Sequence, residues 1–261
     1  MAGIDALLWD VDGVLAETER DGHRVAFNQA FEALGLPWHW SETRYGQLLH
    51  VTGGRERLLA DMAARADAPA LARDRETLAR SLHARKNATY ADLVANGTVA
   101  LRGGVLPLMQ ECRARGVRMG IASTTSRANV DALLQRHLGA SWQDRFAAVV
   151  CGEDVRRKKP DPEVYLAALR RLGETAARVV AIEDSPAGVA AARAAGLAVL
   201  VTRSAYFAAD PVAGAIAVGP GLHDRRGWRP ALHRDDPGTW RIGLDDIAAW
   251  VERRETVAQH D

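Results

Sequence analysis

Two aspartates end the first apolar run of the chain. The stretch LLWDVDGVL covers residues 7–15 and contains Asp10 and Asp12, with Gly13 directly after them. Buried carboxylates are costly unless something pairs with them, so this pattern is a poor way to build a core. It is well suited to holding a divalent cation beside a nucleophilic carboxylate. An Asp-rich turn after an edge strand would explain the motif equally well, so the rest of the chain must decide.

Three further polar clusters follow later apolar runs of the sequence. They are the hydroxyl run 123–126, the basic run 156–159 and the acidic pair Glu183–Asp184. Hydroxyls and backbone N–H groups at a helix start can bind an anion, although an ordinary helix cap looks the same. The basic run could equally be a solvated surface. A second acidic strand end is not expected by chance in a parallel sheet, and it favours a shared site.

Short apolar runs of strand length precede these polar clusters. They lack polar and apolar alternation, which favours buried parallel strands. Helical patterns lie between them, and the alternation from about Val99 onward predicts an α/β fold with a Rossmann-like, doubly wound parallel sheet. After the first strand, the expected strands are 117–122, 147–151, 178–182, 197–202 and 216–218, and the expected helices are 105–115, 129–138, 162–172, 186–195 and 244–251.

The four polar clusters stand at or just after the carboxyl ends of the expected strands. Open α/β sheets bind their ligands at these ends, so we expect the clusters to converge on one site. That site would combine carboxylates, a lysine, hydroxyls and N–H donors. Phosphoryl transfer needs this set: oxygen ligands for Mg²⁺, a nucleophile, and positive groups around the phosphoryl oxygens.

Residues 18–95 differ in character from the rest of the chain. They are rich in Ala, Leu and Arg, and no clear strand pattern interrupts them. We expect a helical cap domain at 18–95, inserted into an α/β core formed by residues 1–17 and 96–261. Polar or flexible residues at both junctions are suited to a hinge. The expected cap helices are 24–34, 41–50, 54–66, 71–84 and 85–94.

Composition narrows the class of protein. The chain has 261 residues, 48% hydrophobic and 26% charged, with a net charge of +1, which is typical of a soluble globular protein. The charge gives no global field for nucleic acid or an anionic membrane, and no apolar stretch is long enough to span a bilayer. Cys112 and Cys151 form neither a disulfide framework nor a metal motif, and no signal peptide is evident. We expect a cytoplasmic monomer with both cysteines reduced in the core.

The C-terminal part has a weaker pattern. Residues 219–238 are rich in Gly, Pro, His and Arg and are expected to form an excursion on the surface. Trp228, Trp240 and Trp250 are expected to pack this part of the chain onto the core, because large aromatic side chains contribute most by burial.

Taken in order, the four clusters resemble the motifs of the haloacid dehalogenase superfamily of phosphatases and phosphomutases. The resemblance extends to about Thr202, and the helical insert matches the helical cap of that family. The matching residues are Asp10-Val11-Asp12-Gly13-Val14, Ser123, Lys159-Pro160 and Glu183-Asp184.

The resemblance implies a mechanism through an aspartyl phosphate. Asp10 would attack phosphorus, and Asp12 would protonate the leaving alcohol and then activate water. Ser123, the Thr124 N–H and Lys159 would bind the transferred phosphoryl group. The implied Mg²⁺ ligands are the Asp10 carboxylate, the Asp12 backbone carbonyl and Asp184, with Glu183 in support.

The cap segments are similar to those of CbbY-type phosphatases, which hydrolyse xylulose-1,5-bisphosphate, an inhibitory misfire product of Rubisco in the Calvin cycle. The similar segments are Glu17-Thr18-Glu19 with His23, Trp38-His39-Trp40 and the Gly-rich turn at 52–57. By that resemblance, the residues contacting the sugar or its distal phosphate would be Glu19, His23, Arg55, Lys86 and Arg127.

Other functions on the same fold stay open. A phosphomutase similar to β-phosphoglucomutase would use Asp10 and Asp12 in the same way but pass the phosphoryl group to a second hydroxyl. Another sugar phosphate could be the substrate. A regulator that binds sugar phosphates without turnover is disfavoured because all four motifs are intact. A 2-haloacid dehalogenase is disfavoured because it has no alcohol for Asp12 to protonate.

Overall fold

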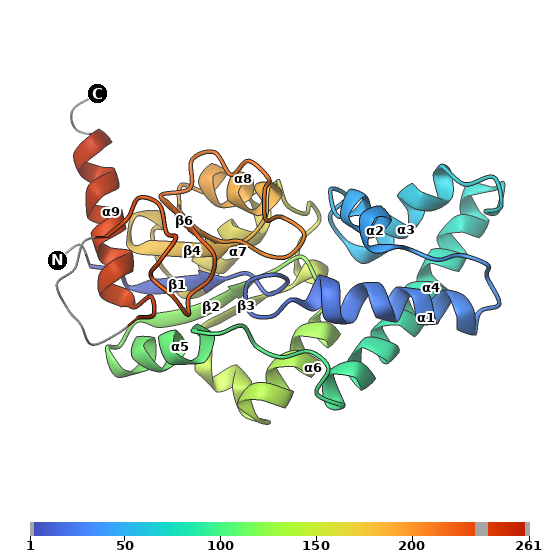
Figure 1. The fold of residues 1–261 in the computed structure, drawn as a ribbon, viewed down its shortest axis with the longest axis horizontal. Helices are drawn as coiled ribbons and strands as arrows, with labels where there is room; N and C mark the ends of the chain where they lie inside the picture. The colour runs from blue at the N-terminus through green and yellow to red at the C-terminus, as the bar shows by residue number, and fades with distance from the viewer. Residues whose placement is uncertain (1–2, 233–239, 259–261) are drawn as a thin grey trace.

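The central sheet of the computed structural model contains six parallel strands in the order β3-β2-β1-β4-β5-β6, within residues 3–232 and 240–258, which the structure describes (Figure 1). Each strand predicted from the sequence is confirmed within a residue or two at its ends. The strands are β1 (Ala6–Trp9), β2 (Arg118–Ala122), β3 (Ala148–Val150), β4 (Val179–Glu183), β5 (Ala198–Thr202) and β6 (Ala217–Gly219).

Helices cover both faces of the sheet, which explains why the strands are apolar throughout. Successive β1 residues enter different hydrophobic clusters: Leu7 packs on the face covered by α5 and α6, and Leu8 on the face covered by α7 and α8. The core helices are α5 (Val105–Ala114), α6 (Arg127–Leu138), α7 (Glu163–Leu172), α8 (Pro186–Ala194) and α9 (Leu244–Ala258), with short 3₁₀ turns at Trp142–Arg145, Gly152–Asp154 and Ala176–Arg178.

The start of α8 fixes the chain directly after the acidic end of β4. The Ser185 hydroxyl accepts a hydrogen bond from the Gly188 N–H, 3.1 Å away, and Pro186 begins the helix. Because α8 begins directly after this N-cap residue, Glu183 and Asp184 stay at the carboxyl edge of the sheet.

The second group of helices extends from the carboxyl edge of the sheet and has its own hydrophobic cluster (Figure 1). Its aromatic centre includes Phe27, Phe31 and Trp40, with Trp40 packed 4.8 Å from Phe27 between ring centroids. Phe207, which follows β5 in the core, joins this cluster. The elements are a π-helix (Glu19–His23), α1 (Arg24–Ala33), α2 (Glu42–Leu48), α3 (Gly54–Ala63) and α4 (Ala72–Ala95).

Two details of these helices differ from the sequence-based expectation. The predicted helices 71–84 and 85–94 form one continuous helix, α4. Its sequence contains no Gly or Pro that would break the helix between residues 72 and 95. The π-helix before α1 was not predicted. The division of the chain into a core and a cap at 18–95 stays a prediction.

The predicted surface excursion at 219–238 is partly wrong. Trp228 is buried and stacks on Trp250 of α9, with ring centroids 4.8 Å apart, so this stretch covers the core. The expected burial of Trp240 is also wrong, because its side chain is 72% exposed. Residues 233–239 lie outside the described part of the chain.

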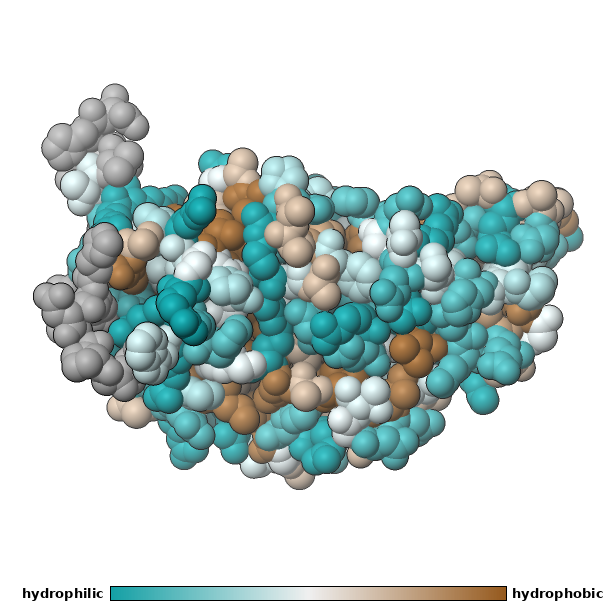
Figure 2. Space-filling view, in the orientation of Figure 1, coloured by the Kyte–Doolittle hydropathy of each residue, from teal (hydrophilic) through white to brown (hydrophobic). Residues whose placement is uncertain are grey.

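Cys112 and Cys151 are buried and free, as expected. Over the described residues, no helix is long and apolar enough to cross a membrane. On the face shown in Figure 2, hydrophilic residues predominate over both the sheet domain and the helical extension, with apolar residues in small separate groups.

Candidate active site

A cavity of about 680 Å³ lies between the sheet edge and the helical cap. It collects most of the residues predicted from the sequence, from both parts of the chain. From the core come Asp10, Asp12, Ser123, Thr124, Lys159 and Asp184, and from the cap come Glu19, His23, Arg55 and Lys86.

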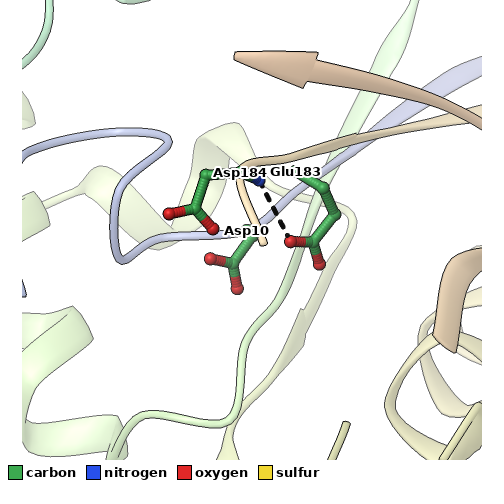
Figure 3. Close-up of side chains that lie close together, drawn as sticks. All are labelled: Asp10, Glu183 and Asp184. Atoms are coloured by element: carbon green, nitrogen blue, oxygen red, sulfur yellow. Dashed lines mark hydrogen bonds between the residues drawn. The ribbon is translucent and has the colours of Figure 1, made fainter. Parts of the chain in front are cut away.

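Three buried carboxyl groups meet at the floor of this cavity (Figure 3). Oxygens of Asp10, Glu183 and Asp184 lie within 4.8 Å of one another, and Asp10 and Asp184 direct their carboxylates toward each other. Burial, with the charges of Glu183 and Asp12, raises the pKa of Asp10 to about 7. Burial, with Asp10 and Glu183, raises the pKa of Asp184 well above its ordinary value. A bound cation would relieve this repulsion, so the three carboxyl groups could hold a metal ion.

Lys159 supplies the positive charge at this floor. Its Nζ lies 2.7 Å from Asp10 Oδ1, 2.6 Å from Glu183 Oε1 and 2.9 Å from the Ala122 carbonyl oxygen. Burial alone would lower the pKa of Lys159, but the charges of Asp10 and Glu183 outweigh it and raise the pKa. The ammonium is therefore charged and fixed beside Asp10 at the floor of the cavity.

Glu183 is enclosed by protein groups on both oxygens. Oε1 accepts hydrogen bonds from Lys159 and from the Tyr165 hydroxyl, and Oε2 accepts the Asp184 N–H at 3.3 Å. Helix α8 passes so close that a Cβ at Gly188 would lie 1.9 Å from Oε2. Glu183 therefore holds Lys159 in place. Tyr165 was missed in the sequence, where it reads as one of the apolar positions of α7.

Asp12 is tied to the beginning of the cap. Its Oδ1 accepts the Thr18 hydroxyl at 2.6 Å and lies 3.0 Å from Nε2 of the buried His23. The π-helix directs the side chains of Thr18 and His23, which are five positions apart, to the same oxygen of Asp12. Burial would raise the pKa of Asp12, but the charge and hydrogen bond of His23 and the bond from Thr18 hold it below its ordinary value.

The hydroxyl run after β2 also lines the cavity. Ser123 is buried, and its hydroxyl accepts the Thr125 N–H at 3.3 Å. Ser123 and Thr124 both line the cavity just before the start of α6. Ser126 occupies the N-cap position of that helix, but its hydroxyl makes no capping bond. This end of the helix offers N–H groups and a positive dipole to an anion.

Lys86 projects from α4 into the cap side of the cavity. It is 2% exposed, its Nζ lies 3.4 Å from Asn87 Oδ1, and none of the ion pairs found among the described residues involves it. The Nζ also lies 5.3 Å from the ring centre of Phe27 and 5.1 Å from that of Tyr90, within cation–π range. Burial lowers the pKa of Lys86 to about 8. The charges of Glu19 and Asp12 offset this burial only in part, so Lys86 is suited to bind an anionic ligand.

Beside Lys86, a buried network links two residues that the sequence did not single out. The Tyr45 hydroxyl donates to Glu19 over 2.5 Å, and Arg57 donates to the Tyr45 oxygen over 2.8 Å and to Glu19 over 3.4 Å. Arg57 stands two positions after Arg55 in the same Gly-rich turn, which was the only available signal. Arg55 lines the cavity but is half exposed, and it pairs with Glu76 at 3.2 Å.

The structure does not bring Arg127 to the cavity, in contrast to the expected sugar contact. Its guanidinium lies 2.7 Å from Asp154 and 3.3 Å from the Val149 carbonyl oxygen. Both partners follow or belong to β3, and Arg127 is not among the residues that line the cavity.

The fold and site together define a class of α/β enzyme with buried carboxylates and a lysine at the carboxyl edge of a parallel sheet, beneath a group of inserted helices. The sequence profile of the haloacid dehalogenase-like hydrolases matches residues 4–196, and the chain belongs to that family. It is a phosphatase of the family.

Relatives of known sequence and structure agree with this assignment. The plasmid-encoded protein CbbY of Cupriavidus necator is 46% identical over 85% of this chain and 87% of its own length. CbbY of Rhodobacter sphaeroides, solved with phosphate and, as a mutant, with xylulose-1,5-bisphosphate, is 39% identical. It covers 81% of this chain and 92% of its own, with a TM-score of 0.76. β-Phosphoglucomutase of Clostridium difficile, 18% identical with a TM-score of 0.69 over 97% of this chain and 99% of its own, shares the fold.

Proposed function

We propose that the protein is a Mg²⁺-dependent phosphatase that converts xylulose-1,5-bisphosphate to xylulose 5-phosphate through an aspartyl phosphate on Asp10. The similar CbbY of Rhodobacter sphaeroides was solved with this bisphosphate, which supports the choice of substrate. We further propose that the enzyme works as a cytoplasmic monomer on a small phosphosugar, with no nucleic acid or membrane as partner.

The observation that carries the proposal is the presence of two separate buried lysines in one cavity, Lys159 at the floor and Lys86 in the cap. Lys159 at the floor is neutralised by Asp10 and Glu183, whereas the buried Lys86 in the cap has no carboxylate within ion-pair distance in the described structure. A sugar with one phosphate would occupy the floor and leave Lys86 with only the more distant charges of Glu19 and Asp12. A bisphosphate would satisfy both, which favours it over a monophosphate.

The carboxyl cluster suits Mg²⁺, because that ion takes oxygen ligands and its charge would relieve the repulsion between Asp10 and Asp184. We expect Asp10, Asp184 and the Asp12 backbone carbonyl to hold it, while Glu183 supports Lys159. When bound, the ion would neutralise charge on the phosphoryl oxygens and on the nucleophile.

The chemistry of the residues follows from their positions. A carboxylate oxygen of Asp10 attacks phosphorus, the P–O bond to the sugar breaks, and Asp12 gives its proton to the leaving oxygen. Asp12 then takes a proton from the water that attacks the aspartyl phosphate, which restores Asp10 and releases phosphate. Lys159 and the Thr124 N–H receive the charge on the transferred group.

Asp12 must carry a proton before the first step, although Thr18 and His23 favour its ionised form. An incoming phosphate dianion adds negative charge beside Asp12 and shifts the carboxyl toward protonation. Binding of the substrate thereby prepares the acid that the reaction uses.

A phosphate-release screen over pentose and hexose mono- and bisphosphates tests the proposal. Xylulose-1,5-bisphosphate should give the highest kcat/KM, and Asp10→Asn should release no phosphate. A better hexose or monophosphate substrate would refute the substrate assignment. Formation of an isomerised phosphosugar in place of inorganic phosphate would instead identify a phosphomutase.

A further inference from the structure

The cap touches the core beside the residue that holds the nucleophile. Lys158 Nζ lies 3.0 Å from Glu56 Oε2 in the first turn of α3. In the same segment of the cap, the Thr52 hydroxyl donates a hydrogen bond to the backbone carbonyl of Lys159. Two neighbouring core residues therefore meet two residues of one cap turn.

These contacts act on a segment that the catalytic floor already holds. The Lys159 side chain is bound by Asp10 and Glu183, and its backbone is bound by Thr52 of the cap. A movement of the cap turn would therefore be transmitted to the backbone of Lys159. Lys158 contributes the charged part of this connection.

Gly53 leaves the space in which the ion pair forms. Its backbone has a φ of +97°, a conformation that residues other than glycine rarely adopt. A Cβ at this position would lie 2.3 Å from Glu56 Oε2 and 2.6 Å from Lys158 Nζ. The turn is therefore shaped around the pair, both in its backbone conformation and in the room that it leaves.

The strength of the pair suits a contact that forms and breaks in each turnover. The side chains of Lys158 and Glu56 are 23% and 35% exposed, so water competes for both partners. Burial would raise the pKa of Glu56, but the hydrogen bond and charge of Lys158, a backbone hydrogen bond and the charge of Arg55 together outweigh burial and lower that pKa. Neither side chain is buried deeply enough to lock the cap shut.

We propose that the Glu56–Lys158 pair docks the cap on the catalytic segment and sets its closed position, which makes Lys158 a positioning residue for Lys159. The pair acts between two parts of the protein and not on the sugar. The inference therefore goes beyond the substrate assignment, and it applies to whichever sugar phosphate the screen identifies as best.

A charge swap separates this role from direct contact with substrate. Lys158→Glu and Glu56→Lys each place like charges together and should lower kcat/KM on the best substrate at least about tenfold. The double variant restores opposite charges and should return to within about threefold of wild type. If Lys158 instead bound substrate directly, the double variant would stay as slow as Lys158→Glu, and that result would overturn the proposal.

A distance measurement tests the same idea without turnover. Spin labels at Leu71→Cys in the cap and Leu166→Cys in α7 sit at exposed positions, and the native cysteines are buried. Removing the pair by Glu56→Gln should add a population with a longer distance between the labels. An unchanged distribution would contradict the proposal, even if the charge-reversal variants failed to fold.

The matched control is Glu111→Gln. Glu111 forms an ion pair of the same length, 3.0 Å, with Arg115. Both residues belong to the α/β part of the chain, and neither lines the cavity. The proposal expects this variant to keep both the wild-type kcat/KM and the wild-type label distance. A comparable change in the control would mean that the loss of any ion pair perturbs the cap, which would count against a docking role for Lys158.

Discussion

Nε2 of His23 lies 3.0 Å from Oδ1 of Asp12, so a side chain of the cap holds the proposed general acid of the core. The contact joins the first residues of the inserted helices to the end of the central strand. It makes the orientation and ionisation of Asp12 depend on the position of the cap.

Replacing Asp12 by Asn should lower kcat by roughly 10²–10⁴, the range typical of a lost general acid. Binding of Mg²⁺ should persist, because the expected ligand from this residue is its backbone carbonyl. Steady-state kinetics and a Mg²⁺ thermal shift, measured on the same preparation, would check both parts. Wild-type turnover in Asp12→Asn would remove this residue from proton transfer.

Replacing Lys86 by Met should raise KM for the bisphosphate by about 10- to 100-fold, as expected for a lost charge-assisted hydrogen bond. Hydrolysis of para-nitrophenyl phosphate, which has no second phosphate, should change little. Arg85→Met is the control, because it removes the same charge from an exposed neighbour on α4. Equal losses on the two substrates would show that Lys86 does not bind a distal phosphate.

The lowered pKa of Lys86, about 8, predicts a pH dependence of substrate affinity. The ammonium is present below this pH and is lost above it, whereas the substrate phosphates are already dianionic. The value of kcat/KM for the bisphosphate should therefore fall as pH rises above about 8. A profile measured on Lys86→Met should lack this limb, and its persistence there would assign the fall to another group.

Mg²⁺ should stabilise the protein more at pH 8 than at pH 5.5. The folded pKa of Asp10, about 7, lies above the value of about 3.9 in an unfolded chain, so the metal-free protein loses stability as pH rises through that interval. Protons compete with the cation at low pH. At 100 times Kd the gain in Tm should be roughly 5–10 °C at pH 8. Asp184→Asn should reduce this gain, and an equal gain at both pH values would contradict the assigned site.

Replacing Trp228 by Ala should cost about 3–5 kcal/mol of unfolding free energy, because it removes a buried ring stacked on Trp250. Substitution of the exposed Trp240 by Ala should change stability by less than about 0.5 kcal/mol. Chemical denaturation of both variants would measure the difference. A small loss in Trp228→Ala would show that residues 220–232 contribute little to the core.

The sequence alone was sufficient to predict the strands and the residues that meet at the floor of the cavity. Uninterrupted apolar runs predict buried parallel strands, and the carboxyl ends of such strands share one edge. Asp10, Ser123 and Asp184 therefore had to meet there, although many residues separate them in the chain.

Only the tertiary structure decided which side chains pair across elements. Tyr165 faces Glu183, Arg57 joins Tyr45 and Glu19, and Arg127 turns to Asp154. These pairings depend on how helices pack and on which neighbouring charge lies nearest, and neither quantity follows a local sequence period. The periodicity of a helix shows which residues share a face, but the packing of the whole chain decides what that face meets.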